Sequence, residues 1–238
     1  MLFESTEVID IHRGLLGLEG DNIEDSLRKF TAGCTLLTDK RRAGKNLARN
    51  VGFELDIAAS FRECELPITL KPPADLWVDI GTTRIALECK RPFSDASIGA
   101  NLDNGFRQLR HRYREHSTPS DVRGILALSG SKMENDGSRF LKGDDLADLN
   151  CSIEHVSNGF VAKTEPFWDH ARDDRTIGIV VCLRALSPTR DANIFTVVRH
   201  FTWIGLAKTQ VDQQLFRSLA EQFNRMIERR LQGDHGGA

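Results

Sequence analysis

Residues 74–91 read Ala-Asp-Leu-Trp-Val-Asp-Ile-Gly-Thr-Thr-Arg-Ile-Ala-Leu-Glu-Cys-Lys-Arg, and this stretch decides the fold. Apolar and polar side chains alternate on both sides of Gly81-Thr82, which is the pattern of a β-hairpin with one apolar face. Glycine at the first central position suits a two-residue type II′ turn. The stretch therefore predicts two adjacent antiparallel strands that pack on the core through one face.

The turn also predicts which residues lie opposite each other. Pairing from Gly81-Thr82 downward places Asp75 opposite Glu88, with Lys90 next on the same face. Two facing carboxylates raise each other's pKa unless a cation lies between them. Mg²⁺ prefers oxygen ligands, and the backbone carbonyl of Cys89 can add one. We therefore expect a Mg²⁺ or Mn²⁺ site at Asp75, Glu88 and the Cys89 carbonyl, with Lys90 beside the attacking water.

Asp79 is the alternative to Asp75 as the metal ligand on this strand, because the two residues share a face. Its partner across the hairpin is Arg84, close to the turn. An exposed ion pair is the better interpretation of these two residues, and such pairs stabilise a protein little. Trp77 lies on the same face, where packing beside the site is preferred over stacking on a base.

The residues before the hairpin predict a helix over 46–63. Glu54 falls on the apolar stripe of this helix, and an inward carboxylate is costly unless something binds it. Glu54 is therefore a candidate metal ligand and catalytic residue, and a helix-surface acid is the alternative. The stripe consists of Leu47, Val51, Ala58 and Phe61.

A second helix is predicted over 97–116, after the hairpin. Basic side chains cover its faces outside the apolar stripe, and they would contact phosphates if they line the cleft. A solvated helix face is the alternative. His111 and His116 are weak candidates for a metal ligand or a base. The predicted nucleic-acid contacts are Arg91, Arg107, Gln108, Arg110 and Arg114.

The order of the remaining elements predicts an α/β fold with a mixed central sheet flanked by helices. Residues 1–45 are expected to form a helical extension packed on the core, and residues 46–238 the main domain. Residues 134–175 give no clear pattern. Further strands are predicted over 123–129, 177–183 and 194–204, and a last helix over 212–231.

Composition narrows the function classes. The net charge of -2 argues against a nonspecific nucleic-acid coat protein, which would be strongly basic. Five cysteines without a CxxC pair argue against a disulfide framework and against a zinc site. The first residues lack the basic and apolar segments of a secretory signal, and no apolar run approaches the ~20 residues of a membrane helix. We expect a cytoplasmic protein with no membrane partner.

The hairpin resembles the PD-(D/E)xK nuclease superfamily, which includes restriction endonucleases and Holliday-junction resolvases. The resemblance rests on Asp75 and on Glu88-Cys89-Lys90, and covers residues 46–130. It implies a restriction-endonuclease-like core. In such a core Glu54 corresponds to the acidic residue that many members carry on the preceding helix. Gln108 or its basic neighbours correspond to the polar residue that the following helix often contributes to the site. Ala74 stands where many members have proline. Gln108 and Tyr113 lie one residue too far apart for the QxxxY of the RecB-like branch.

The resemblance implies a metal-dependent endonuclease that hydrolyses DNA in bacterial restriction, phage defence or repair. RNA is an alternative substrate. We expect a homodimer or a partner protein, because cutting both strands needs two sites. The alternative function is a catalytically inactive binding subunit of a larger complex on the same fold. A third hypothesis is a small-molecule or RNA-processing hydrolase built on this core.

Overall fold

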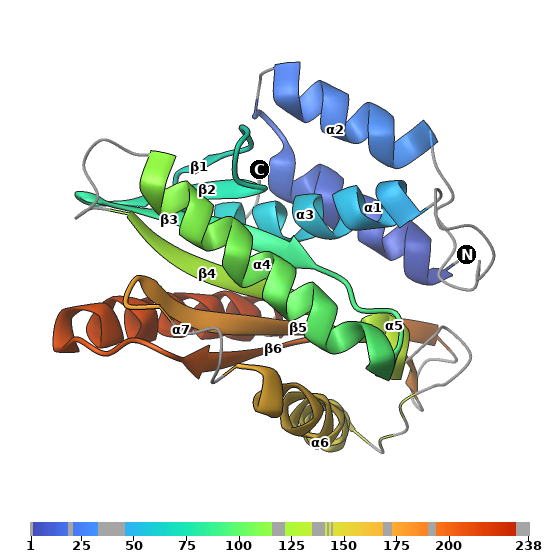
Figure 1. Ribbon diagram of the computed structural model, residues 1–238. Coiled ribbons are helices and arrows are strands. Elements are labelled where there is room, and N and C mark those ends of the chain that lie inside the picture. Colours follow the sequence, from blue (N-terminus) through green and yellow to red (C-terminus); the bar gives the residue numbers. More distant parts are fainter. Residues whose placement is uncertain are drawn as a thin grey trace.

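A six-stranded mixed sheet lies at the centre of the molecule in the computed structural model (Figure 1). The structure describes residues 2–18, 21–32, 46–115, 122–134, 141, 143, 145–168, 173–189 and 194–231. The first three strands are antiparallel neighbours, the third, fourth and fifth run parallel, and the sixth is antiparallel to the fifth. In spatial order they are β1 Ile68–Thr69, β2 Leu76–Ile80, β3 Thr83–Lys90, β4 Val122–Ser129, β5 Thr176–Thr189 and β6 Ile194–Gly205.

Helices cover both faces of this sheet (Figure 1). One face packs on α1, α3 and α7, which share a core with the apolar residues of β2 and β3. The other face packs on α4 and α6. None of the described helices is long and apolar enough to cross a membrane. The helices are α1 Leu2–Leu15, α2 Asp21–Ala32, α3 Asn46–Glu63, α4 Asp95–Glu115, α5 Ser131–Glu134, α6 Leu146–Thr164 and α7 Gln210–Leu231, with a 3₁₀ turn at Glu165–Phe167.

The hairpin of β2 and β3 has the predicted register. Ile80 pairs with Thr83 and Leu76 with Leu87, and Gly81 has the positive φ of +57° that a type II′ turn requires. The prediction of a single apolar face was wrong. On the opposite face Trp77, Ala86, Glu88 and Lys90 are also buried, because α4 covers that side of the hairpin.

The helix predicted over 46–63 is α3, with the same limits. Val51, Ala58 and Phe61 are buried as expected, but Leu47 is exposed because it lies in the first turn, before the helix reaches the core. The N-terminal helices α1 and α2 both pack on α3. Helix α6 lies in the region 134–175, for which no helix or strand was predicted.

Gly124 on β4 lies where α4 comes closest to the sheet. A Cβ at this position would collide with the Tyr113 hydroxyl, which bonds to Thr176 Oγ1 at 3.0 Å. Replacing Gly124 with alanine is expected to lower the free energy of unfolding by about 1–3 kcal/mol. Urea denaturation measures this change.

The matched control is Gly159→Ala on the exposed side of α6, where a Cβ would meet no atom within 4 Å. Alanine should stabilise that helix by roughly 0.5–1 kcal/mol. Equal effects of the two substitutions would contradict the assigned packing of α4 on β4.

Candidate active site

Asp75 lies immediately before β2, with its carboxylate turned toward the neighbouring strand. Its Oδ2 accepts a hydrogen bond from the backbone N–H of Cys89 at 2.7 Å. This contact holds Asp75 beside Glu88 on β3, as the hairpin register predicts. The side chain of Asp75 keeps about a quarter of its surface exposed, so the carboxylate is accessible to solvent.

The Lys90 ammonium is the centre of the site. Its Nζ lies 3.2 Å from Glu88 Oε2, 3.1 Å from the Cys89 carbonyl oxygen and 3.6 Å from Asp75 Oδ2. Glu88 is fully buried and Lys90 is nearly so. Four residues predicted from one hairpin therefore supply a cation and three oxygen atoms that converge on it.

Arg112 on α4 is a site residue that the sequence reasoning missed. Its Nε donates to Glu88 Oε1 at 3.0 Å, so that both oxygens of this buried carboxylate contact a cation. The position was visible in the sequence, since Arg112 follows Leu109 of the apolar stripe by three residues and so lies beside that stripe. Gly105 lets α4 approach closely here, because a Cβ on it would lie 3.3 Å from Lys90 Cγ.

Glu54 on α3 belongs to the same electrostatic group. Burial, followed by the negative charge of Asp75, raises its pKa to about 7. The same two causes raise the pKa of Glu88 to about 7, against the opposing effects of Lys90 and Arg112. Burial is thus the main reason that these two carboxyl groups resist ionisation, and the negative charge of Asp75 adds to it.

These shifts predict how the stability of the metal-free protein depends on pH. The folded-state pKa values of Glu54 and Glu88 exceed their ordinary value, so the folded state binds more protons than the unfolded state between about pH 4.5 and about pH 7. Stability in EDTA should therefore fall across this window and level off above it. Urea denaturation over the same pH range measures the slope.

The matched control is the double variant Glu54→Gln/Glu88→Gln, which should show a flatter profile. His200 has a pKa lowered by burial, so it gives the opposite slope in both proteins. Identical profiles of wild type and variant would contradict the assignment.

The predicted nucleic-acid contacts do not form one surface. Arg107 and Arg114 are exposed on α4, while Gln108 and Arg110 on the same helix are half-buried. Arg107 also donates to Asn104 on its own helix at 2.7 Å. Arg91 is separate from them, because it follows Lys90 and lines a cavity on the α3 side of the sheet.

Two alternatives are resolved by the geometry. Asp79 forms the expected ion pair with Arg84 at 3.2 Å, with both side chains well exposed. Trp77 is 3% exposed and donates to the Lys71 carbonyl at 3.0 Å, so it packs in the core and presents no face to a base. His111 is exposed on α4, and His116 lies outside the described residues.

The donor set fits a hard divalent cation. Asp75, Glu88 and the Cys89 carbonyl provide the oxygen ligands that Mg²⁺ and Mn²⁺ prefer, and the Lys90 ammonium shows that these oxygens converge on positive charge. No cluster of three or more His, Cys, Asp or Glu side chains in metal-binding arrangement occurs among the described residues. Glu54 is therefore not assembled with the other two carboxylates in this arrangement.

In comparisons with protein-family models, with curated proteins and with solved structures, nothing matches this chain.

Proposed function

We propose that the chain is a metal-dependent endonuclease that hydrolyses DNA phosphodiester bonds on a restriction-endonuclease-like core. One observation carries the proposal: oxygens of Asp75, Glu88 and Cys89 converge on the ammonium of Lys90 at one end of a hairpin. A fully buried carboxylate, Glu88, that faces a second carboxylate, Asp75, is costly to a fold, and this supports a functional role for the pair. The resemblance of the hairpin to PD-(D/E)xK nucleases supports the same proposal.

In the proposed enzyme, Asp75, Glu88 and the Cys89 carbonyl would hold Mg²⁺ or Mn²⁺, and Glu54 would assist from α3. Such an ion, when bound, lowers the pKa of a water ligand and neutralises charge on the phosphate. Arg112 holds Glu88 in place through its bond to Oε1. This contact leaves the second carboxylate oxygen, Oε2, turned toward Lys90 and the centre of the site.

Lys90 is the proposed catalytic residue of the chain. It would orient the attacking water, assist its deprotonation or stabilise charge on the phosphate. Its near-complete burial fixes the ammonium against β3, while the more exposed Asp75 marks the side from which a phosphate reaches it. A buried, fixed cation stabilises developing negative charge more than a hydrated one, because no solvent reorganises around it.

DNA is the proposed substrate, with RNA as the alternative. The exposed arginines of α4, Arg107 and Arg114, are proposed to contact backbone phosphates. Binding would then weaken steeply as salt rises. A role in restriction, phage defence or repair follows from the resemblance alone, as does the homodimer or partner protein that cutting both strands requires.

The test is cleavage of supercoiled plasmid and of single-stranded DNA and RNA with Mg²⁺, with Mn²⁺ or with EDTA. Wild type should cut only with metal. Glu88→Gln should reduce cleavage by about 10²–10³-fold, because it removes a charged ligand while keeping the shape of the side chain. Mn²⁺ titration followed by electron paramagnetic resonance measures metal binding independently of cleavage.

The outcomes separate the rival functions. Metal binding without cleavage of any nucleic acid would contradict nuclease activity on these substrates. Absence of both metal binding and cleavage would favour an inactive binding subunit. In such a subunit the bond between Arg112 and Glu88 would be purely structural.

A further inference from the structure

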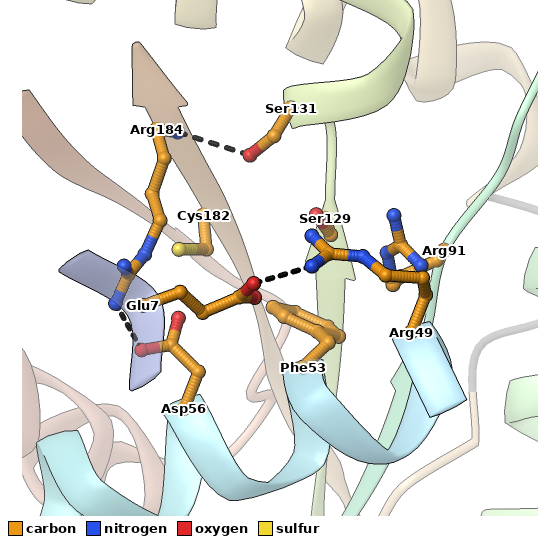
Figure 2. Close-up of a pocket in the computed structure, with 9 residues that line it drawn as sticks. All are labelled: Glu7, Arg49, Phe53, Asp56, Arg91, Ser129, Ser131, Cys182 and Arg184. Atoms are coloured by element: carbon orange, nitrogen blue, oxygen red, sulfur yellow. Dashed lines mark hydrogen bonds and ion pairs between the residues drawn. The ribbon is translucent and has the colours of Figure 1, made fainter. Parts of the chain in front are cut away.

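A polar cavity lies on the α3 side of the sheet, and Figure 2 shows the residues that line it. Its wall comes from α1, α3 and α5, from the carboxyl ends of β3 and β4, and from the neighbouring part of β5. Arg49, Arg91 and Arg184 enter the wall from three different elements, and Figure 2 shows Glu7 between them.

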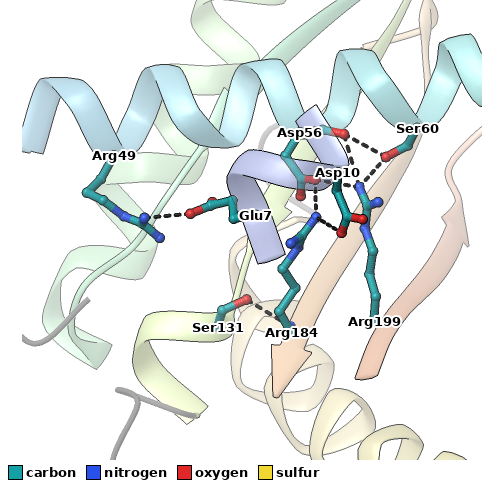
Figure 3. Close-up of polar contacts among 8 residues, drawn as sticks. All are labelled: Glu7, Asp10, Arg49, Asp56, Ser60, Ser131, Arg184 and Arg199. Carbon is teal, nitrogen blue, oxygen red and sulfur yellow. Dashed lines mark hydrogen bonds and ion pairs between the residues drawn. The ribbon is translucent and has the colours of Figure 1, made fainter. Parts of the chain in front are cut away.

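Positive charge exceeds negative charge around this cavity. Arg49 pairs with Glu7 at 2.5 Å, Arg184 pairs with Asp56 and with Asp10, and Arg199 also pairs with Asp56 (Figure 3). Four arginines therefore face three carboxylates. Of these four arginines, Arg91 is the one for which no ion pair with a described residue occurs, although Glu7 lies close enough to act on its pKa. A partly buried cation of this kind is costly unless an anion accompanies it. The four arginines are Arg49, Arg91, Arg184 and Arg199, and the carboxylates are Glu7, Asp10 and Asp56.

Hydrogen-bond donors remain unused at the cavity wall. Arg184 is 3% exposed, yet its Nε and Nη1 have no hydrogen-bond partner. The Ser131 hydroxyl accepts from the backbone N–H of Arg184 at 3.0 Å, so its own proton is available to a further acceptor. Buried donors without acceptors cost roughly 1–3 kcal/mol each. The wall is thus rich in donors and short of acceptors.

Burial and a neighbouring positive charge both act on the Arg91 guanidinium. Burial, followed by the charge of the nearby Arg49, lowers the pKa of Arg91 to about 10. It is also the least buried of the three arginines in the wall, so it is the one that solvent reaches. Inside, the cavity has room for about one water-sized group.

We propose that this cavity is an oxyanion site that binds a phosphate group, with one oxygen inside the cavity and the remainder beside Arg91. Arg184 and Ser131 donate to the inner oxygen, and Arg91 neutralises the charge at the mouth. None of Glu54, Asp75, Glu88 and Lys90 lines this cavity, so the site is separate from the carboxylate centre and does not rest on the proposed nuclease function. The phosphate is either a free ion or the terminal phosphate of a nucleic acid.

The first test is thermal unfolding of the full chain in EDTA with sodium phosphate, balanced by chloride at constant ionic strength. Wild type should show a saturable rise in Tm, from which the phosphate Kd follows. Arg91→Gln should weaken phosphate binding at least about tenfold, because it removes the charge at the mouth. Arg62→Gln, on the exposed side of α3, is the matched control and should bind as wild type does.

A second variant tests the charge balance by removing a negative charge where the first variant removes a positive one. Glu7→Gln keeps the shape of the side chain beside Arg49 but removes a negative charge from the cavity wall. Phosphate binding should tighten by about threefold to tenfold. Unchanged or weaker binding in this variant would overturn the proposal, as would equal phosphate binding by wild type and Arg91→Gln or a Tm rise no larger than chloride gives.

Oligonucleotides distinguish the two sources of the phosphate. Their affinity is measured in EDTA with a 5′-phosphate, with a 3′-phosphate and with hydroxyl ends. If one terminal phosphate raises the affinity in wild type but not in Arg91→Gln, this result supports the proposal and assigns the site to a nucleic-acid end. Tight binding of inorganic phosphate without such a gain supports it and assigns the site to a free ion.

Discussion

Lys90→Met is expected to lower the rate of metal-dependent DNA cleavage by about 10²–10⁴-fold. Methionine fills nearly the same buried volume but removes the ammonium that lies within 3.2 Å of Glu88 Oε2 and 3.1 Å of the Cys89 carbonyl. The same oxygens would be free to bind a cation, so metal affinity should persist or rise. Single-turnover cleavage and Mn²⁺ titration measure the two quantities separately.

The control for this substitution is Lys208→Met, which removes a lysine of an exposed ion pair with Asp174. Its cleavage rate should stay within about twofold of wild type, because exposed pairs contribute little. Cleavage by Lys90→Met at the wild-type rate would remove Lys90 from the mechanism. Loss of both cleavage and metal binding would mean that Lys90 only supports the fold.

Asp56→Ala is expected to lower the free energy of unfolding by about 3–5 kcal/mol, the largest effect on stability that we predict. Asp56 is 1% exposed and pairs with Arg184 and with Arg199 Nη2, the latter at 2.8 Å. Its removal leaves two buried guanidinium groups with less negative charge, while the desolvation cost of both remains. Urea denaturation should show the loss, and Tm should fall by roughly 10 °C.

The matched control is Asp79→Ala, which removes the same carboxylate from an exposed pair with Arg84. This change should cost less than about 1 kcal/mol. Similar losses at Asp56 and Asp79 would contradict the view that burial sets the cost of breaking an ion pair in this protein. The double variant Asp56→Leu/Arg184→Met should recover part of the loss, because it removes a buried charge of each sign.

Local patterns in the sequence determined the hairpin and the limits of α3. Alternation and the glycine of the turn predict the pairing of β2 with β3, because in a hairpin the turn type and loop length set the register. That register also places Asp75 beside Glu88 and Lys90. These features depend on residues within one short stretch, which is why they could be predicted without any tertiary contact.

The tertiary structure alone decided which charges meet across long separations. Arg112 reaches Glu88 over 24 residues, Arg49 reaches Glu7 over 42, and Arg184 reaches Asp56 over 128. Periodicity assigns a residue to a face of its own element but carries no information about which side chain another element brings to that face. The candidate carboxylate site was therefore predictable from one hairpin. The contact of Arg112 with Glu88 and the polar cavity on the α3 side of the sheet followed only from packing.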